Sequence, residues 1–519
     1  MSMLDIWWLP DWVLLLVVIA VLTVLYSRYF ADNRVKYGLP GPDRWPLLGH
    51  LPLGFKLGFL EFHKHLSNKY GKMVALSPGS LDARFGTLII SDLDMIKEIL
   101  VKQGSIFTDR NVDEKTQVKP LDKTILSLKG DHWKQVRGTM TPTFSSGKLR
   151  QMNGHIVDCA KTTVKNLQVI AKKGETFDMQ EIWGAFAMDS ICATAFGIKV
   201  DSQNNPEEPF VANARQLQSA SFANPFLLLF ILVPRLMVLC EPLLPYLVGN
   251  FIKPIRFFQH ATDELYDEGQ KSKNGKAIDF IHLMQKAHEL HMDNDELADD
   301  VKEVGKWKKR ALTRDEIVAN GMVFFLAGFR TTSETLSFMC YNLAIYPEIQ
   351  ERLQKEIDDT LQGTDPSYDN VASLQYLDQV MSETMRMYPL GFVLDRVPNQ
   401  DTTVKGLFIP KGTSVIVPVY AIHHDPELYP DPEKFDPERF TPEAKANRNP
   451  YSYMPFGLGP RNCIGMRLAL LEMKVVIVKV LQNLTFKSCE KTQVPMKFLK
   501  SRPMKPEKGI WLKVEERCQ

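Results

Sequence analysis

The fold of this chain is indicated by one short stretch, residues 456–465, which reads FGLGPRNCIG. Three glycines and a proline predict an irregular loop, and residues 466–481 after it have the pattern of a helix. Cys463 would therefore lie at a helix N-terminus, where the helix dipole and free N–H groups favour a thiolate. Glycines allow close approach of a ligand, and Arg461 adds a fixed cation. The stretch predicts a metal-binding cysteine; a buried unreactive cysteine, the alternative, would not explain its neighbours.

These ten residues resemble the haem-binding signature of the cytochrome P-450 family, Phe-x-x-Gly-x-Arg-x-Cys-x-Gly, at every specified position. The resemblance implies the cytochrome P-450 fold, which is mainly α with a small β portion, and haem b as cofactor. It also implies that Cys463 is the axial thiolate ligand, which donates electron density that favours O–O cleavage. Phe456, Arg461 and Gly465 are then expected beside the cofactor.

Further residues match positions that contact the haem propionates in this family. Trp133 and Arg137 match its Trp-x-x-x-Arg motif, and a spacing of four places both on one helix face. Arg110 and Arg396 lie where related enzymes have further propionate-binding arginines. Guanidinium pairs with a carboxylate through two hydrogen bonds, so these side chains suit the two carboxylates of haem. For Arg110 and Arg396, ordinary surface arginines stay an open alternative.

Three other residues are expected to form scaffold and not to take part in catalysis. Glu383 and Arg386 share one face of a predicted helix that stops before Pro389. Taken alone, such a pair is commonly a surface ion pair of little energy. Arg439, within Pro-Glu-Arg-Phe, supplies the third member of the buried structural triad of the family.

A long helix is predicted between Thr313 and Pro347. Thr313 and Glu316 form a capping-box pattern, and the apolar run after them has no proline before Pro347. A helix of about 33 residues is roughly 50 Å long, enough to cross a domain. Pro347 would begin the next helix, and β-rich stretches are expected only at 85–90 and 407–420.

The middle of this helix, residues 327–332, reads AGFRTT, where the family pattern is Ala-Gly-x-Asp/Glu-Thr-Thr. Thr331 matches the threonine beside bound dioxygen, whose hydroxyl helps to deliver protons. Arg330 replaces the acid, and a guanidinium cannot release a proton near neutral pH. Glu334 could pair with Arg330 or take over the proton relay, and an Arg330 that points away from haem is a further alternative. We predict slower oxygen activation than in a relative that has the acid.

The C-terminal segment, residues 486–515, is similar to the family-3 microsomal branch, of which thromboxane synthase is a relative. The resemblance implies a large, adaptable apolar pocket for bulky lipophilic substrates of the steroid, fatty-acid or xenobiotic type. Each expected wall residue could equally belong to ordinary core. The expected walls are Phe324, Phe325, Ala327, Phe392 and Val393.

The N-terminus has the pattern of a membrane anchor. Residues 12–27 carry no charge, and Asp11 is the only charge between 6 and 27, a span sufficient for one bilayer crossing. Basic residues follow the run from Arg28 on, which predicts that the rest of the chain faces the cytosol. A cleaved signal peptide is the alternative, but no basic region precedes the run. We predict a single-pass protein of the endoplasmic reticulum membrane.

Three units are expected along the chain: an anchor at 1–30, a Pro/Gly-rich hinge at 31–45 and a haem-binding catalytic domain at 46–519. A second apolar stretch, 221–234, contains two prolines, which argue against a second span. We expect it to dip into the cytosolic leaflet and contact membrane lipid, with an ordinary core helix as the alternative.

The composition is that of an ordinary folded protein. With 63 Lys and Arg against 61 Asp and Glu, the net charge of +2 is too balanced for a basic nucleic-acid-binding surface, so no nucleic-acid partner is expected. The seven cysteines show no Cys-x-x-Cys spacing, and neither a disulfide framework nor a zinc finger is indicated.

Three functions are compatible with the resemblance. The first is a monooxygenase that inserts one atom of dioxygen into a lipophilic substrate, with electrons from NADPH–cytochrome P-450 reductase and with cytochrome b5 as a further candidate partner. The second is an electron-independent haem-thiolate isomerase that acts on a lipid peroxide, as thromboxane synthase does. The third is a non-enzymatic haem-binding protein. The cysteine loop, the anchor and the Trp-x-x-x-Arg motif do not separate the first two functions, and the long helix departs from the family pattern at Arg330; we expect the monooxygenase.

Overall fold

The computed structural model describes most of the chain after residue 32. The described ranges are 33–45, 49–77, 86–112, 119–219, 243–271 and 312–517, with residue 117 and scattered residues at 13–21, 224–240 and 280–285. The predicted anchor and the 221–234 stretch therefore lie largely outside the described residues. Within the described part, no helix combines the length and the apolar character needed to cross a bilayer.

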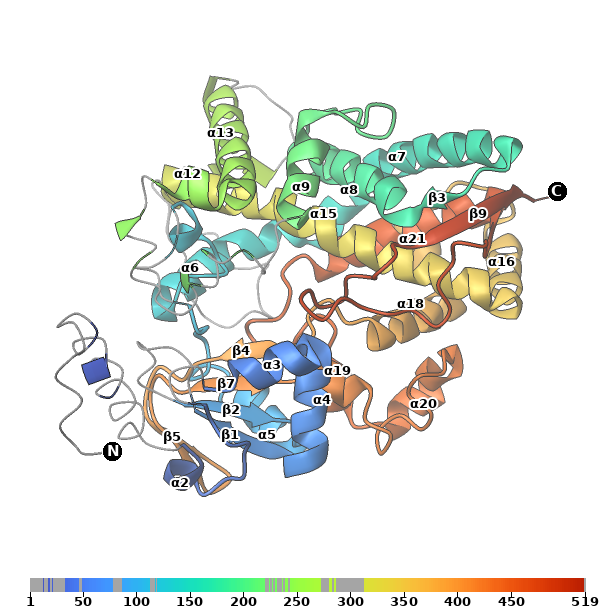
Figure 1. Cartoon of the computed structure of the whole chain (residues 1–519). Helices are drawn as coiled ribbons and strands as arrows, with labels where there is room; N and C mark the ends of the chain where they lie inside the picture. Colours follow the sequence, from blue (N-terminus) through green and yellow to red (C-terminus); the bar gives the residue numbers. More distant parts are fainter. Residues whose placement is uncertain are drawn as a thin grey trace.

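Helices make up most of the described chain, in agreement with the predicted mainly α fold (Figure 1). The α-helices are α2 (Asn33–Tyr37), α3 (Leu51–Leu57), α4 (Phe59–Tyr70), α5 (Leu93–Lys97), α6 (Gly130–Met140), α7 (Ser146–Lys173), α8 (Met179–Ala195), α9 (Pro209–Ser219), α12 (Leu244–Leu247), α13 (Gly249–Lys271), α15 (Arg314–Ile345), α16 (Pro347–Leu361), α17 (Tyr368–Ala372), α18 (Gln375–Met387), α19 (Val419–His423), α20 (Pro442–Asn447) and α21 (Met466–Asn483).

Among the described residues, the β portion is small and divided among three sheets. The largest has the order β1-β2-β7-β4, with a parallel β2–β7 pair between two antiparallel pairs. The others are β3-β9-β8 and β5-β6. The strands are β1 (Met73–Leu76), β2 (Thr87–Ile90), β3 (Phe177–Asp178), β4 (Leu394–Arg396), β5 (Thr402–Val404), β6 (Leu407–Ile409), β7 (Ser414–Val417), β8 (Leu484–Lys487) and β9 (Trp511–Glu516). The predicted β stretch 407–420 is thus two strands in different sheets, followed by α19.

The long helix predicted from the capping box is α15. Thr313 Oγ1 accepts from the backbone N–H of Glu316, and the Glu316 carboxylate accepts from the backbone N–H of Thr313, so both halves of the capping box form. The helix has 32 residues, and α16 begins at Pro347. These local signals were therefore sufficient to place both helices.

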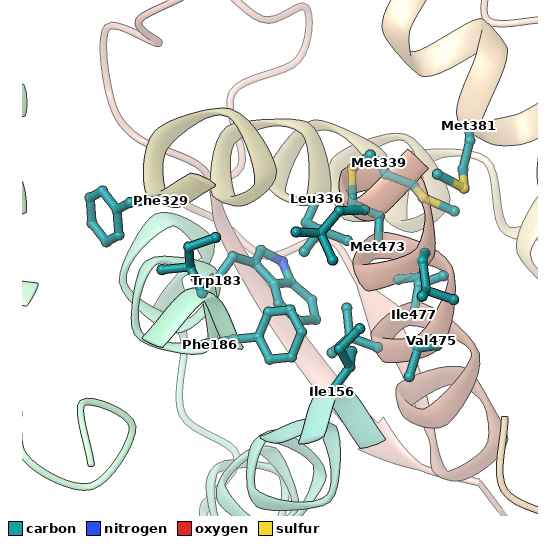
Figure 2. Close-up of a cluster of buried hydrophobic side chains, with 14 of the residues drawn as sticks. Ile156, Trp183, Phe186, Phe329, Leu336, Met339, Met381, Met473, Val475 and Ile477 are labelled. Atoms are coloured by element: carbon teal, nitrogen blue, oxygen red, sulfur yellow. The ribbon is translucent and has the colours of Figure 1, made fainter. Parts of the chain in front are cut away.

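The main core lies where α15 meets α8 and α21 (Figure 2). Trp183 and Phe186 of α8 are fully buried and point toward Leu336 of α15 and Ile156 of α7. Met473 of α21 closes the cluster from the other side. Most residues of α15 are therefore buried.

The larger sheet forms a separate layer with its own core. It lies below the helical part in Figure 1, with α3, α4 and α19 beside it. Within the predicted hinge at 31–45, residues 33–45 are described: they contain α2 and then run along this sheet, where the carbonyl of Pro40 accepts from Ala75 N at 2.9 Å. A Cβ on Gly41 would lie 2.2 Å from the carbonyl oxygen of Ala75, so this approach requires glycine.

Candidate functional site

The loop 456–465 is folded tightly against the sheet layer. Cys463 N donates to the carbonyl of Phe456 at 2.8 Å and closes the loop. Gly459 has a φ of +71°, and a Cβ there would lie 1.7 Å from the carbonyl oxygen of Leu100. Gly465 caps α21, and a Cβ on it would meet no atom of the described protein within 4 Å, which leaves open space beside the cysteine.

The side chain of Cys463 is exposed to an internal cavity of about 410 Å³. Burial raises the pKa of its thiol, while the N–H groups of Gly465 and Met466 and the nearby Arg137 guanidinium lower it. Cys340, within α15, has its pKa raised well above the usual range by burial, and the only counteracting contact is with Trp183. Unlike Cys340, Cys463 thus has surroundings that offer cations and helix-terminal N–H groups to a thiolate.

Two arginines and a tryptophan from the α6 region and the loop border this cavity. Arg137 donates to the backbone oxygen and to Oδ1 of Asn462, each at 3.0 Å. Arg461 donates to the carbonyls of Thr108 (2.5 Å), Ile125 (2.8 Å) and Leu128. Its guanidinium also lies 4.0 Å above the Trp133 ring.

Arg461 therefore connects Thr108, Ile125 and Leu128 to the cysteine loop. This organising role was not visible in the sequence, because the three carbonyls are more than 300 positions away along the chain.

Arg110 and Arg396 are brought together by a backbone bridge between Asp109 and Val397. Arg110 lines the cavity, and its Nε has no hydrogen-bond partner. Arg396 is 2% exposed, donates from Nη1 to the carbonyl of Asp395 at 2.7 Å, and leaves Nη2 without a partner. Arg396 is thus buried, while Arg110 is half-buried and borders the cavity.

The electrostatics of these arginines fit a dianionic cofactor. Burial, together with repulsion from Arg110, lowers the pKa of Arg137 and of Arg396 to about 10 and that of Arg461 to about 9. A cluster of buried cations with unpaired N–H groups requires a compensating negative charge. The two carboxylates of haem would supply such a charge.

One face of α15 forms the opposite wall of the cavity. Phe324, Ala327 and Thr331 line it, and Thr331 Oγ1 donates to the carbonyl of Ala327 at 2.7 Å. Phe325, also expected as a wall, faces away: its ring stacks on Phe196 with centroids 3.7 Å apart, outside the residues that line the cavity. The helical period of 3.6 residues places positions 324 and 325 about 100° apart, and Phe325 lies on the side of α15 that packs against Phe196 and Phe258.

The other two expected wall residues also lie off the cavity. Phe392 packs against Phe59 and His63, and neither Phe392 nor Val393 is among the residues that line the cavity. Leu390 and Leu394, on either side of them, line it instead. An irregular segment has no fixed period, so the sequence could not show which of its side chains point inward.

Arg330 and Glu334 form an ion pair beside the cavity wall. Arg330 Nε donates to Glu334 Oε1 at 2.9 Å, and the Arg330 side chain is 49% exposed. Glu334 Oε2 is buried without a partner, and burial raises the pKa of this carboxyl. Neither residue is among those that line the cavity. Of the alternatives for Glu334, the structure shows the pair with Arg330.

The expected triad lies away from the cavity. Arg386 donates to both carboxylate oxygens of Glu383 at 2.7 and 2.8 Å, and both side chains are fully buried. Arg439 Nε lies 3.4 Å from Glu383 Oε1, without hydrogen-bond geometry. Arg386 also donates to the carbonyl of His423, which connects α18 to α19.

Comparison with known proteins shows the family of this chain. A sequence profile described as Cytochrome P450 matches residues 39–514. Cytochrome P450 3A41 of Mus musculus is 40% identical over 515 residues, which are 98% of this chain and 97% of the relative. Cytochrome P450 3A29 of Sus scrofa and Cytochrome P450 3A12 of Canis lupus familiaris are each 40% identical over 97% of this chain and 96% of their own lengths.

The chain belongs to the cytochrome P450 family. It is therefore an oxidoreductase of the monooxygenase class, and proteins of this family bind haem through a cysteine thiolate. The resemblance drawn from the loop 456–465 is confirmed, as are the P450 fold and haem as cofactor.

Proposed function

We propose that this P450 inserts one oxygen atom into lipophilic substrates at the cavity bounded by Cys463, the arginine cluster and α15. The observation that carries the proposal is the position of Cys463: its sulfur faces the cavity from the N-terminus of α21, among buried arginines with unpaired N–H groups. Cys463 would hold the haem iron, and Arg110, Trp133, Arg137, Arg396 and Arg461 would surround the propionates, with Phe456 and Gly465 beside the ring.

The overall reaction balances as follows. A substrate C–H group, dioxygen, two electrons and two protons give a C–OH group and water. Haem supplies the site at which dioxygen is reduced and cleaved. The two electrons come from NADPH through a flavoprotein reductase; cytochrome b5 is a second candidate donor.

Residues of α15 would transfer protons and bound the space for substrate. Thr331 carries a hydroxyl on the cavity wall, and we propose that this hydroxyl delivers protons to the part of the cavity in which dioxygen would bind. Phe324 and Ala327 bound the substrate space. Glu334 stays a candidate proton donor that is held by Arg330 in this structure.

The assignment of Cys463 as the haem ligand is tested by the absorption spectrum that is typical of thiolate ligation. In Cys463→Ala, the carbon monoxide spectrum of the reduced protein should lose the absorption band typical of thiolate ligation. Cys159→Ala is the matched control, because burial raises the pKa of that thiol to about 12 and the residue lies on α7, outside the residues lining the cavity. A normal thiolate band in Cys463→Ala would exclude this ligand.

The reaction class is tested by its electron requirement. A lipophilic probe incubated with NADPH and reductase should be oxygenated, with one NADPH consumed per oxygen inserted when coupling is complete. Turnover of a lipid hydroperoxide without any reductant would instead support the isomerase. Neither reaction in protein that contains haem would support the non-enzymatic alternative.

We further propose that residues 1–30 anchor the protein in the endoplasmic reticulum membrane by a single span, that 31–45 connect the anchor, and that 46–519 form the catalytic domain in the cytosol. The uncharged run at 12–27 supports this arrangement. The 221–234 stretch would add a second contact with membrane lipid. Deletion of residues 1–30 should release the domain from membranes only in part; complete release at low salt would argue against the second contact.

A further inference from the structure

One carboxyl group, that of Glu472, lies on the face of α21 that borders the cavity at Cys463. Gly465, Leu468 and Met473 line this cavity together with Glu472, and their spacing of three or four residues corresponds to one helix face. The helical rise places Glu472 about 10 Å beyond Gly465. Of the described residues that line the cavity, Glu472 is the only one with a carboxyl group. Nothing in the proposed monooxygenase reaction uses it.

This carboxyl group is buried without a cation. Glu472 is 2% exposed, its Oε1 accepts from the Ser190 hydroxyl at 2.7 Å, and it forms no ion pair among the described residues. The cations of its own helix, Arg467 and Lys474, are bonded to side chains of α17 and α18 instead. Burial raises the pKa of Glu472 to about 7, so the group is partly ionised near neutral pH.

Two other titratable groups lie near Glu472, on α7 and α8. Cys159 of α7 has its pKa raised to about 12 by burial, so this thiol is neutral at ordinary pH. Asp189 of α8 accepts from the backbone N–H groups of Ser202 at 2.8 Å and Gln203 at 3.3 Å. Burial raises the pKa of Asp189 as well, which makes Asp189 the alternative titrating group that an experiment has to separate from Glu472.

The remaining walls present no cation to this carboxyl group. From α15, Thr332 and Thr335 line the cavity and carry no charge. The ion pair of Arg330 and Glu334, also on α15, lies outside the residues that line the cavity. The arginines of the cavity are bonded around the cysteine loop. Within the described part of the chain, a negative charge on Glu472 is thus left without a counter-ion.

We propose that Glu472 takes up a proton when the haem is reduced, so that the reduction potential of this P450 depends on pH. One electron from the flavoprotein reductase enters the haem, and one proton from water converts the Glu472 carboxylate to the acid. The reason is electrostatic: reduction adds a negative charge inside the cavity, and an ionised Glu472 repels that charge through the protein interior. The inference rests on the proposed haem site and not on the proposed oxygen insertion.

The expected size follows from Coulomb's law. Over about 10 Å, at an effective dielectric constant of about 20, one added charge changes the proton affinity of a carboxyl group by roughly tenfold. Reduction should therefore raise the pKa of Glu472 further above its usual range. Because the reduced protein then binds more protons, the potential should fall as the pH rises from about 7 upwards. A tenfold change corresponds to a total fall of about 59 mV for one electron.

The proposal is tested by redox titration of the haem-loaded, substrate-free protein between about pH 6 and about pH 9. The potential of the unmodified protein should fall by about 59 mV more over this range than that of Glu472→Gln. Glutamine does not titrate but can still bond to Ser190. The haem propionates are present in both proteins, so the difference between the two curves reports Glu472 alone. Curves with equal slopes would overturn the proposal.

Two further variants assign the titration. Asp189→Asn is the matched control, because it removes a neighbouring buried carboxyl group that does not line the cavity. Its curve should keep the fall in potential; loss of the fall in Asp189→Asn but not in Glu472→Gln would overturn the assignment to Glu472. The hydrogen bond from Ser190 lowers the pKa of Glu472, so Ser190→Ala should move the fall to higher pH. A curve that does not move would contradict the assignment.

If Glu472→Gln does not fold, infrared difference spectroscopy of the unmodified protein decides. Reduction near neutral pH should add the C=O stretching band of a protonated carboxylic acid. This band should stay in place when the haem propionates carry isotope-labelled carbon, whereas a propionate band would shift. Absence of the band, or a shift with the label, would overturn the proposal. Neither measurement requires turnover, so failure of the proposed oxygen insertion and failure of this inference are distinguishable.

Discussion

Two buried glutamates, Glu383 of α18 and Glu334 of α15, each pair with an arginine about one helical turn away. Glu383 receives two hydrogen bonds from Arg386, both side chains are fully buried, and the remaining donors of the arginine are taken up by backbone carbonyls. Glu334 receives one bond from an arginine that is 49% exposed, and its second oxygen has no partner. The first pair connects α18 to neighbouring segments; the second is local to α15.

Glu472 of α21 extends this comparison to a buried carboxyl group without a cation. It is 2% exposed, and its Oε1 lies 2.7 Å from the hydroxyl oxygen of Ser190 on α8. Burial raises the pKa of Glu472 to about 7. The three glutamates show that the environment, and not the residue type or its helical spacing, decides whether a buried carboxyl is a scaffold ion or a titrating group.

The largest effect is expected from removal of Glu383. Glu383→Ala leaves Arg386 charged and buried without its partner, which should destabilise the fold by about 3–5 kcal/mol. Urea unfolding of the haem-loaded protein measures this loss. Glu351→Ala, on the exposed face of α16, is the control and should change stability by no more than about 0.5 kcal/mol. A change below about 1 kcal/mol in Glu383→Ala would contradict the scaffold role.

The next effect is the pH dependence that Glu472 introduces. Because its folded-state pKa is raised from 4.5 to about 7, its stabilising contribution is complete below about pH 4.5 and is lost as the pH rises through 7. The loss should reach about 3 kcal/mol. Glu472→Gln keeps a hydrogen-bonding group toward Ser190 and should flatten this part of the stability–pH curve. An identical slope in both proteins would show that another group titrates.

A smaller effect is expected at Thr331 and Arg330. Thr331→Ala removes the hydroxyl on the cavity wall and should slow product formation by about tenfold or more. Arg330→Glu frees Glu334 from its ion pair and restores an acid beside Thr331, so the product formed per NADPH consumed should rise. Unchanged coupling in Arg330→Glu would show that the proton path runs through Thr331 without either acid.

The smallest effect should come from an exposed pair. Arg352 and Glu438 lie 2.5 Å apart on the surface, with side chains 57% and 51% exposed. Arg352→Ala should lower stability by no more than about 1 kcal/mol, because solvent screens such pairs. The stability difference between Arg352→Ala and the unmodified protein should shrink further at about 0.5 M salt. The screening length is already about 10 Å at roughly 0.1 M salt and becomes shorter at higher concentrations. A loss as large as that of Glu383→Ala would remove the distinction between the buried and the exposed pairs.

Sequence patterns were most reliable where one motif carried several constraints together. The loop 456–465 combined glycines, an arginine and a cysteine before a helix, and it identified the family. Single residues on a face were harder to assign: Phe324 lines the cavity while Phe325 packs on Phe196. Leu390 and Leu394 took the places expected for Phe392 and Val393.

Local interactions explain what the sequence alone determined. The bounds of α15 follow from the capping box at Thr313 and from Pro347, and the glycine-rich loop before α21 follows from its own residues. Each of these features depends on hydrogen bonds or backbone geometry within a few residues.

Only the tertiary structure decided which distant residues meet. It brought Arg110 beside Arg396 and directed Arg461 to the carbonyls of Thr108, Ile125 and Leu128. These contacts join positions hundreds of residues apart, and packing of whole helices sets them. No local pattern can encode such a contact, because its free energy depends on both partners and on the water that both exclude.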